Sequence, residues 1–594
     1  MSSLSEKLTA AGFPKPNPNS KIAHALRRTP VGESPEFNRI LSLPRRKIII
    51  ENKEVFIEKE GKREKIPDLT PVFKKLGGRM TLRPLQNAAI WESYNNNGGF
   101  LSLAVGEGKS LISLLLPEAM NSKRAVLFVK PELRDQLIKR DIPLYGKHFY
   151  LPLRKTFVVA YSELSSARQA EILERIQPDL IIADEAHKLR MKSSARTRRF
   201  LRYMRKHPEV RFVALSGTFT RRSIMDYAHL IELALKKNSP VPKNYKDLEE
   251  WCESIDIADD PRPPGVLSQF CIEGENVREG YQRRLTETPG VVSSEEMSLG
   301  TSLLIIEKKL DIPEKIKKEL ARLYDTWEIE DEELSDAMSL NRVARQEVCG
   351  FYYKWNWPKG IKDEEWVKAR RFWNREVRTR LLHTSLPGLD SPFLLYNAAR
   401  EGRWQSLAFP GWQAVKHRPE PPTIPVWLDY FMAKDAILWG KALEKKGEGG
   451  IIWCEHVALG ELIAKGGDWN WYGVGADAGA VDKRKEPVIV ASLKSQIEGK
   501  NLQAWSKALV TTPPANGSSW EQLLGRLHRQ GNLADEIEFY VYLHSREFIN
   551  AFEQAKNDAE FIEETSGQKQ KLNFAQIIRL DNESSNDSSS DNGN

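Results

Sequence analysis

The sequence predicts an α/β protein with two parallel-sheet lobes and a helical insertion between them. Short apolar runs alternate with amphipathic or polar stretches over residues 71–235, and the same alternation returns over residues 426–560. Such alternation is typical of buried parallel strands wrapped by helices. Residues 236–425 lose it and carry long charged stretches typical of helices. A chain of 594 residues is also too long for one hydrophobic core, so several domains are expected.

The apolar runs give the expected strands of each lobe. In the first lobe they lie at residues 125–129, 156–160, 180–184 and 212–216. In the second lobe they lie at residues 450–454, 487–492, 507–512 and 538–543. The runs are mostly apolar, as expected of strands covered on both faces.

Two further segments flank the lobes. Residues 1–70 form a polar N-terminal extension whose stretch Lys47–Ile66 reads as a β-hairpin, with alternating apolar residues on either side of a turn. Residues 561–594 form a C-terminal segment. It ends in a Ser/Asn/Asp-rich tail, residues 580–594, which cannot bury apolar surface and is expected to be disordered.

Composition narrows the class of protein. The chain is 40% hydrophobic and 29% charged, as in soluble globular proteins, and its net charge of +8 favours a polyanionic partner. A soluble protein that is merely basic is the alternative. The four cysteines lie far apart without metal-ligand spacing, which argues against zinc and disulfides. Without an apolar run long enough for a signal peptide or a membrane span, a cytoplasmic location is expected.

The first chemical motif lies between a strand-like run and a helix-compatible run. Gly106, Glu107, Gly108, Lys109 and Ser110 have the composition of a phosphate-binding loop. Glycines let backbone N–H groups point toward phosphates, and the following helix N-terminus adds its dipole. Lys109 would reach the β- and γ-phosphates of ATP, and the Ser110 hydroxyl would ligate Mg²⁺. A short G-x-G-K-S sequence also occurs by chance, but the strand-loop-helix context favours the functional reading.

A pair of carboxylates follows further along the chain. The run at 180–184 ends in Asp184 and Glu185, which places both side chains at the carboxyl edge of the predicted sheet. Asp184 can then hold Mg²⁺, and Glu185 can polarise the attacking water. The alternative is an acidic pair on the surface at a strand end.

Together these motifs resemble those of superfamily-2 helicases, in detail the Swi/Snf-type branch. Asp184-Glu185-Ala186-His187 matches the DEAH box, and Gln86 stands where the family places a glutamine against adenine. Ser216, Gly217 and Thr218 match the coupling motif, together with His187. In the second lobe, Gly499, Asn501 and Gln503 match the motif that senses DNA and nucleotide. The resemblance implies RecA-like lobes and the use of ATP and Mg²⁺.

The last motif that resembles the family pattern contains two arginines. Its matching residues are Gln522, Gly525, Arg526, His528, Arg529 and Gly531. The family pattern implies that Gln522 lies at the nucleotide and that Arg526 and Arg529 act as arginine fingers across the cleft between the lobes, which elsewhere raises rates about 10³–10⁵-fold. An Arg-rich surface helix is the alternative.

The chain departs from the family pattern in three places. Leu103 stands where the full phosphate-loop spacing has glycine, Ser110 replaces threonine, and Ser495–Glu498 replace a glycine-rich run. The last departure puts the DNA-contact role of that loop in doubt. Since no accessory chromatin-type module is recognised, a compact bacterial or phage enzyme is expected.

Nucleic acid could bind at two further places. Nine of the 16 tryptophans lie within residues 327–439, and the run 367–383 adds Arg370, Arg371, Arg375, Arg378 and Arg380. These side chains could stack on bases and contact phosphates, but most of the tryptophans are expected to form the insertion's own core. The second candidate is the basic N-terminal set Arg27, Arg28, Arg45, Arg46 and Lys47.

The function predicted from these observations is an ATPase that translocates on nucleic acid, with double-stranded DNA as the expected partner and a monomeric state. A strand-separating DNA or RNA helicase is the first alternative, and its wedge would be the hairpin at 47–66. A nucleotide-controlled clamp or adaptor is the second. Glu185 and the two arginines favour hydrolysis over a pure switch.

Overall fold

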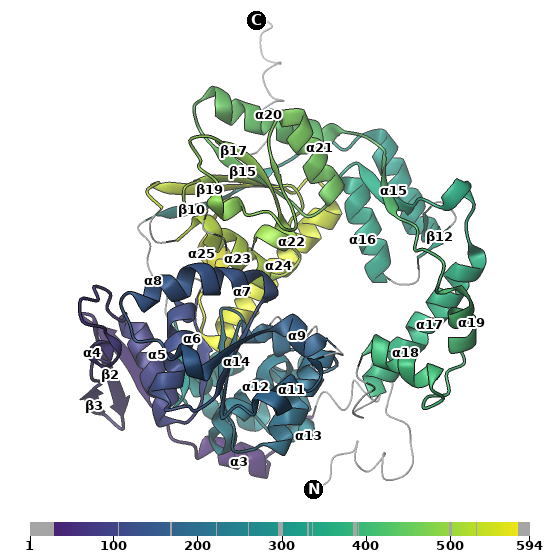
Figure 1. Ribbon diagram of the computed structural model, residues 1–594. Coiled ribbons are helices and arrows are strands. Elements are labelled where there is room, and N and C mark those ends of the chain that lie inside the picture. The colour runs from purple at the N-terminus through teal and green to yellow at the C-terminus, as the bar shows by residue number, and fades with distance from the viewer. Residues whose placement is uncertain are drawn as a thin grey trace, which may run out of the picture. The chain divides into compact units, whose positions relative to one another are not determined.

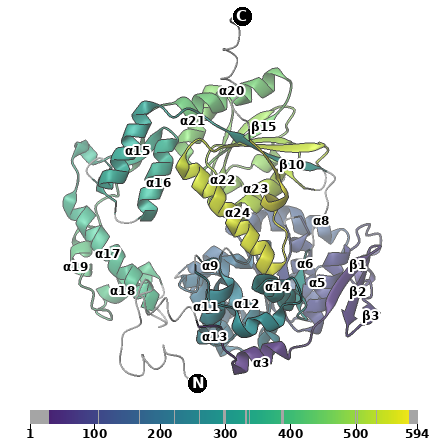
Figure 2. The same ribbon diagram turned by 180° about the vertical axis from the view of Figure 1, so that it is seen from behind.

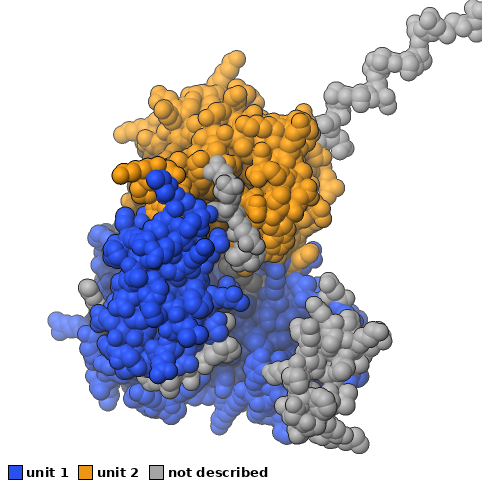
Figure 3. Space-filling view, turned by 90° about the vertical axis from the view of Figure 1, so that its right-hand side faces the viewer, with its two compact units in different colours: residues 1–297, 361–420, 558–570 blue, residues 298–360, 421–557, 571–594 orange. Residues whose placement is uncertain are grey.

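The structure, a computed structural model, describes residues 29–104, 106–166, 169–220, 222–258, 260–294, 301–329, 332–334, 337–383, 389, 391–497, 500, 502–529 and 532–579. The chain divides into two compact units, coloured separately in Figure 3. Unit 1 comprises residues 1–297, 361–420 and 558–570, and unit 2 comprises residues 298–360, 421–557 and 571–594. None of the helices in the described ranges has both the length and the apolar content needed to cross a bilayer.

Unit 1 is built on a six-stranded parallel sheet with the strand order β6-β5-β7-β8-β4-β9. Its strands are β4 (Gly99–Ser102), β5 (Ala125–Val129), β6 (Thr156–Ala160), β7 (Leu180–Asp184), β8 (Arg211–Ser216) and β9 (Val291–Ser293). The four strands predicted for this lobe are therefore present as β5, β6, β7 and β8, and β4 and β9 extend the sheet.

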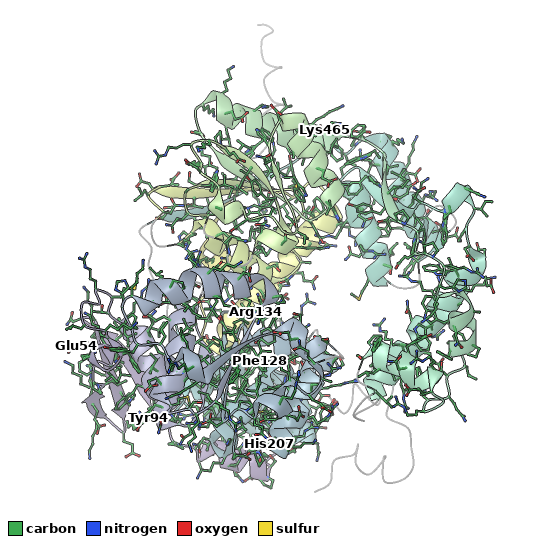
Figure 4. All side chains as sticks on the ribbon, viewed as in Figure 1. Glu54, Tyr94, Phe128, Arg134, His207 and Lys465 are labelled. Carbon is green, nitrogen blue, oxygen red and sulfur yellow. The ribbon has the colours of Figure 1, made fainter. Side chains whose placement is uncertain are left out.

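The apolar side chains of the strands in unit 1 pack into two separate hydrophobic cores. In β5, Val126 and Phe128 pack into one core with helices α11 and α12, whereas Ala125 and Leu127 pack into the other with helices α5 and α6. Successive strand residues point to opposite faces, so a strand covered on both sides must be apolar throughout. Figure 1 shows these helices around the sheet, and Figure 4 shows Phe128 inside unit 1.

The helices of unit 1 come from three stretches of chain. The first comprises α3 (Pro35–Leu41), α4 (Thr70–Phe73), α5 (Pro84–Asn95), α6 (Lys109–Ala119), α7 (Pro131–Gln136), α8 (Ile142–Gly146), α9 (Tyr161–Ser165), α10 (Ile172–Ile176), α11 (Ala195–Lys206), α12 (Met225–Leu235), α13 (Tyr245–Ile255) and α14 (Val277–Thr286). The second comprises α17 (Glu364–His383), α18 (Pro392–Arg400) and α19 (Phe409–Val415). The third is the end of α24 (Arg546–Ser566), a helix that begins in unit 2.

The stretch predicted as a hairpin forms a three-stranded antiparallel sheet. Strands β1 (Lys47–Glu51) and β2 (Glu54–Lys59) form the hairpin, and β3 (Lys62–Lys65) adds a third strand to β2. Val55 and Ile57 of β2 pack with Ala88 of α5. Figure 2 shows the sheet beside that helix.

Unit 2 is built on a seven-stranded parallel sheet with the order β16-β17-β15-β18-β19-β10-β20. These strands are β10 (Ser302–Lys308), β15 (Gly450–Cys454), β16 (Trp471–Tyr472), β17 (Val488–Ser492), β18 (Lys507–Val510), β19 (Glu536–Tyr542) and β20 (Gln576–Ile578). Its helices are α15 (Glu314–Thr326), α16 (Ala337–Val348), α20 (Phe431–Lys445), α21 (Val457–Gly467), α22 (Leu493–Gln496), α23 (Gly517–Leu527), α25 (Lys571–Phe574) and the first part of α24. The α/β class with two parallel sheets is thus confirmed.

The stretch predicted as a helical insertion is mainly helical but also supplies strands. It contributes β9 to the sheet of unit 1 and β10 to the sheet of unit 2. The remaining strands are β11 (Glu328–Ile329), β12 (Glu332–Glu333), β13 (Phe351–Trp355) and β14 (Thr423–Trp427), which pair as two short antiparallel ladders. Sequence alternation missed β9 because three residues are too short to show a pattern.

Tryptophans of the insertion do pack with one another, as expected for most of them. Trp373 of α17 is buried, with its ring centroid 5.6 Å from that of Trp404, and it also contacts Phe409. Trp355 and Trp357 stack with centroids 5.5 Å apart. Helices α17, α18 and α19 therefore enclose a small aromatic core of their own.

Candidate nucleotide-binding and hydrolysis site

The phosphate-binding loop lies between β4 and α6, at the carboxyl edge of the sheet of unit 1. Gly106 and Gly108 have φ angles of 99° and 73°, a region that glycine adopts without strain. A Cβ on Gly108 would lie 2.3 Å from the side-chain nitrogen of Gln86. Glycine is therefore required at position 108 by both conformation and space.

Lys109, the first residue of α6, turns its side chain back over the loop. Its Nζ donates hydrogen bonds to the carbonyl oxygens of Leu103 and Ala104, at 3.0 and 3.2 Å. Both acceptors precede the loop, so the ammonium group is held at the end of β4. This is the position from which a lysine can bind phosphate oxygens.

Gln86 is placed against the same loop. It is buried near the start of α5, where its side-chain oxygen accepts from the backbone N–H of Arg83 at 3.0 Å. Its side-chain nitrogen donates to the carbonyl oxygen of Glu107 at 3.1 Å. The predicted contact with adenine stays a prediction, and the structure adds a contact with the loop backbone.

Asp184 is the last residue of the central strand β7, and Glu185 follows it directly. The side-chain Oδ1 of Asp184 is buried and has no hydrogen-bond partner among the described residues. Burial and the neighbouring Glu185 carboxylate raise the pKa of Asp184 to about 7. Burial also opposes ionisation of Glu185, but the Lys130 and Lys109 ammonium groups outweigh it and hold the pKa of Glu185 well below its usual value.

These residues suit a magnesium ion. Mg²⁺ prefers oxygen ligands, keeps several waters, and takes only one or two carboxylates from the protein. The unpartnered carboxylate oxygen of Asp184 and the hydroxyl of Ser110, in the first turn of α6, are ligands of this kind. The donor set therefore fits Mg²⁺ bound together with nucleotide phosphates.

A chain of polar contacts joins the carboxylate motif to the next strand. His187 Nδ1 lies 3.3 Å from a carboxylate oxygen of Glu185 and 3.2 Å from the Ser216 hydroxyl at the end of β8. The Ser216 hydroxyl in turn accepts from the backbone N–H of Thr218 at 3.1 Å. Gly217 borders the phosphate loop, since a Cβ there would lie 3.5 Å from Lys109 Nζ. The predicted nucleotide-site residues of unit 1 thus gather around one edge of its sheet.

The arginine motif of unit 2 lies on and after α23. Arg526 is buried, and its guanidinium donates to the carbonyl oxygens of Lys500 and Gln522 at 3.0 and 3.2 Å. Gln522 is also buried, and Arg529, just past the helix, is half-buried. Gly499, Asn501 and Gly531 lie outside the described residues. The catalytic roles of the two arginines stay predictions.

The departure at Ser495–Glu498 has a structural consequence. Gln496 is buried, and its side-chain nitrogen donates to the carbonyl oxygens of Gly473 and Ala476 at 2.9 and 3.0 Å. Its side-chain oxygen accepts from the backbone N–H of Ala478 at 3.2 Å. Gln496 therefore holds a neighbouring loop in place, a role that no glycine could fill.

One of the predicted phosphate-binding residues is structural. Arg46 is 2% exposed, pairs with Glu92 at 2.9 Å, and donates to the carbonyl oxygens of Thr286 and Val291. The prediction that Arg46 contacts phosphate is therefore wrong, because its guanidinium is already bound inside unit 1. Arg27 and Arg28 lie outside the described residues.

The arginines of α17 differ in their surroundings. Arg370 pairs with Glu420 at 2.6 Å and lies over the ring of Trp366. Arg371, Arg375 and Arg378 are exposed, and Arg380 is half-buried. Contact between these exposed side chains and phosphate stays a prediction.

Sequence reasoning missed two features of unit 1. Lys130 is buried at the end of β5 and helps to hold the Glu185 carboxylate in its charged form. The sequence signal for Lys130 was a polar residue directly at the end of a buried apolar run, the same signal that identified Asp184.

The second feature is the segment 188–206, which includes α11 and holds nine lysines and arginines without an acidic residue. Arg205 and Lys206 at its end are exposed.

Fold and site together define a helicase-like domain of superfamily 2, a class of P-loop NTPases, in the first lobe. Residues 79–221 match the ResIII family model, described as the type III restriction enzyme, res subunit. The matched range contains Gln86, the phosphate loop, the carboxylate pair and Ser216–Thr218, and this class of domain implies hydrolysis of ATP, typically with Mg²⁺. No match is found among curated proteins.

Proposed function

We propose that the protein is a Swi/Snf-type motor that couples ATP hydrolysis to movement along double-stranded DNA. The observation that carries the proposal is the convergence of Lys109, Asp184 and Glu185 at one sheet edge, with His187 linking Glu185 to Ser216. Phosphoryl transfer depends mainly on positioning and on stabilisation of charge, and this arrangement provides both.

Each side chain has one role in the proposed reaction. Lys109 binds the β- and γ-phosphates, while Asp184 and Ser110 hold Mg²⁺, which neutralises charge on the phosphates. Glu185, kept ionised by Lys130 and Lys109, orients the attacking water and accepts its proton. Arg526 and Arg529 of unit 2 stabilise the charge on the transferring phosphoryl group.

The choice of DNA as the partner rests on charge. The chain carries a net charge of +8, and the segment 188–206 follows the DEAH motif directly. Lysine and arginine bind duplex backbones by releasing condensed counterions, without reading sequence. DNA bound to this segment would lie close in the chain to His187, whose ring contacts the Ser216 hydroxyl. We place the protein, as a monomer, in the cytoplasm of a bacterial or phage-infected cell.

A strand-separating helicase is the second candidate. Its wedge would be the hairpin of β1 and β2, but that hairpin is part of a three-stranded sheet whose apolar face packs on α5. This packing favours translocation without strand separation. A clamp that binds ATP without turnover is disfavoured by Glu185, whose ionised carboxylate suits a hydrolytic role.

Two assays test these proposals in turn. ATP turnover is measured with and without duplex DNA for the wild type and for Glu185→Gln. We expect stimulation by DNA in the wild type and loss of turnover with retained ATP binding in the variant. DNA-independent turnover would contradict the motor, and equal turnover in Glu185→Gln would contradict the assigned site.

The second assay compares two DNA substrates. A translocase displaces the third strand of a triplex but leaves a forked duplex paired. Unwinding of the forked duplex would instead support the strand-separating helicase. Turnover-free binding that depends on ATP would support the clamp.

A further inference from the structure

The C-terminal segment 558–570 packs on unit 1, far along the chain from the rest of that unit. Asp558 pairs with Arg222 at 2.6 Å, and Glu564 pairs with Arg278 at 3.0 Å. The hydroxyl of Ser293, at the end of β9, donates to the backbone carbonyl of Ser566 at 3.3 Å. These contacts bring the residues after α24 to the edge of the sheet where β4 enters the phosphate loop.

Gln568 is the residue of this segment that faces the loop. It is fully buried, and its side-chain oxygen accepts a hydrogen bond from the hydroxyl of Ser102, the last residue of β4, at 3.2 Å. Its side-chain nitrogen lies 3.8 Å from the position that a Cβ on Gly217 would occupy. Lys109 Nζ lies 3.5 Å from the same position. The amide nitrogen of Gln568 and the ammonium of Lys109 therefore border the same glycine.

The amide nitrogen of Gln568 has no acceptor among the described residues. A buried donor without a partner is unfavourable, and native structures retain few of them without a reason. The side-chain donors of the neighbouring residues Ser566 and Gln570 are bonded locally, although the side-chain oxygen of Gln570 has no partner among the described residues. The Ser566 hydroxyl donates to the carbonyl oxygen of Ile562 at 2.6 Å, and the side-chain nitrogen of Gln570 donates to backbone carbonyls of its own segment. Gln568 thus differs from its neighbours in directing an unused donor toward the nucleotide site.

We propose that Gln568 contacts the nucleotide, donating a hydrogen bond to the terminal phosphate of ATP bound at Lys109. The inference rests on the proposed function and extends it, because it adds a residue from outside the matched range 79–221 to the nucleotide site. Lys109 supplies charge to the phosphates, and Gln568 supplies a neutral donor beside it. Since ADP lacks the terminal phosphate, the contact discriminates between ATP and ADP.

The test compares the affinities of the full chain for Mg²⁺–ATPγS and Mg²⁺–ADP by calorimetry. Gln568→Met keeps the side-chain volume but removes both polar groups. We expect it to weaken ATPγS binding about 10-fold or more, as for loss of a hydrogen bond to a charged group, with ADP binding changed less than about twofold. Gln568→Glu keeps the acceptor for Ser102 and sets a negative charge near the phosphate, so it should weaken ATPγS binding further.

Ser566→Ala is the matched control, because it removes a buried hydroxyl of the same segment that bonds only within its own helix. It should leave both affinities unchanged. If Gln568→Met does not fold, as judged by its thermal transition, Ser102→Ala provides the second variant and should weaken ATPγS binding selectively by loosening the amide.

The results separate two kinds of failure. An unchanged ratio of ATPγS to ADP affinity in Gln568→Met, or equal loss of both, overturns the role of Gln568 and leaves the motor intact. If the wild type binds neither nucleotide, the proposed function itself fails.

Discussion

The buried ion pair of Arg46 and Glu92 should be essential to the edge of the sheet that carries the phosphate loop. The side chains are 1% and 4% exposed, and their charged atoms lie 2.9 Å apart. Glu92 also accepts the backbone N–H of Gly290 at 2.6 Å, and Arg46 donates to the carbonyl oxygen of Val291. Both contacts anchor β9, which pairs directly with β4.

The expected loss of unfolding free energy follows from the charged group that each variant leaves buried without its partner. Glu92→Ala leaves a guanidinium buried with only carbonyl partners, and breaking such a pair costs about 3–5 kcal/mol. Because the Thr286 carbonyl remains at 2.8 Å and the Val291 carbonyl also remains, we expect the lower part of that range, about 3 kcal/mol. The double variant Arg46→Met with Glu92→Leu removes both charges and should be destabilised by less than either single change.

Urea unfolding of the wild type, both single variants and the double variant measures this coupling. Hydrogen exchange of peptides covering β4 and β9 assigns the loss to unit 1, which matters because the chain has more than one cooperative unit. The reasoning would be refuted by additive losses in the double variant, or by Glu92→Ala with unchanged stability and exchange.

Three further predictions concern catalysis, stability and DNA. Lys109→Ala should abolish ATP turnover, whereas Arg529→Ala should lower turnover with little loss of ATP binding; steady-state assays and nucleotide titration check both. Burial raises the pKa of Glu347 to about 7, so the folded state binds the extra proton and unfolding free energy falls as pH rises from about 4.5 to 7. Thermal melts at pH 5 and pH 8 should therefore show a larger loss of stability in the wild type than in Glu347→Gln, and equal losses would contradict the role of Glu347. Arg205→Ala with Lys206→Ala should lower the slope of log affinity for duplex DNA against log salt by about 1–2, and an unchanged slope would exclude these two exposed side chains from the DNA site.

The alternation of buried strands and helices in the two lobes could be predicted from the sequence. The inner residues of β5, β7 and β8 are apolar because alternate residues face two cores, and that property is visible without a structure. Asp184 ends one such run, and the loop that carries Lys109 follows another, so their meeting at one sheet edge could be inferred. Chain order and local pattern carried this information.

What could not be predicted depends on contacts between distant positions. Arg46 resembled a surface phosphate ligand, since only the folded chain brings Glu92 and the Val291 carbonyl to it. Gln568 lies in a stretch without a motif, and its relation to Ser102 arises from packing alone. Strand β10 was assigned to the insertion because the stretch around it lacks the alternation seen elsewhere.

The return of residues 558–570 to unit 1 has a consequence for biosynthesis. A ribosome makes the phosphate loop long before the buried residues Phe561, Ile562 and Gln568. Until those residues are made, the nascent first lobe exposes the surface that they cover, so its final folding step waits for them. A truncated first lobe expressed for biochemical work should accordingly need this short stretch supplied, either fused through a linker or added as a peptide.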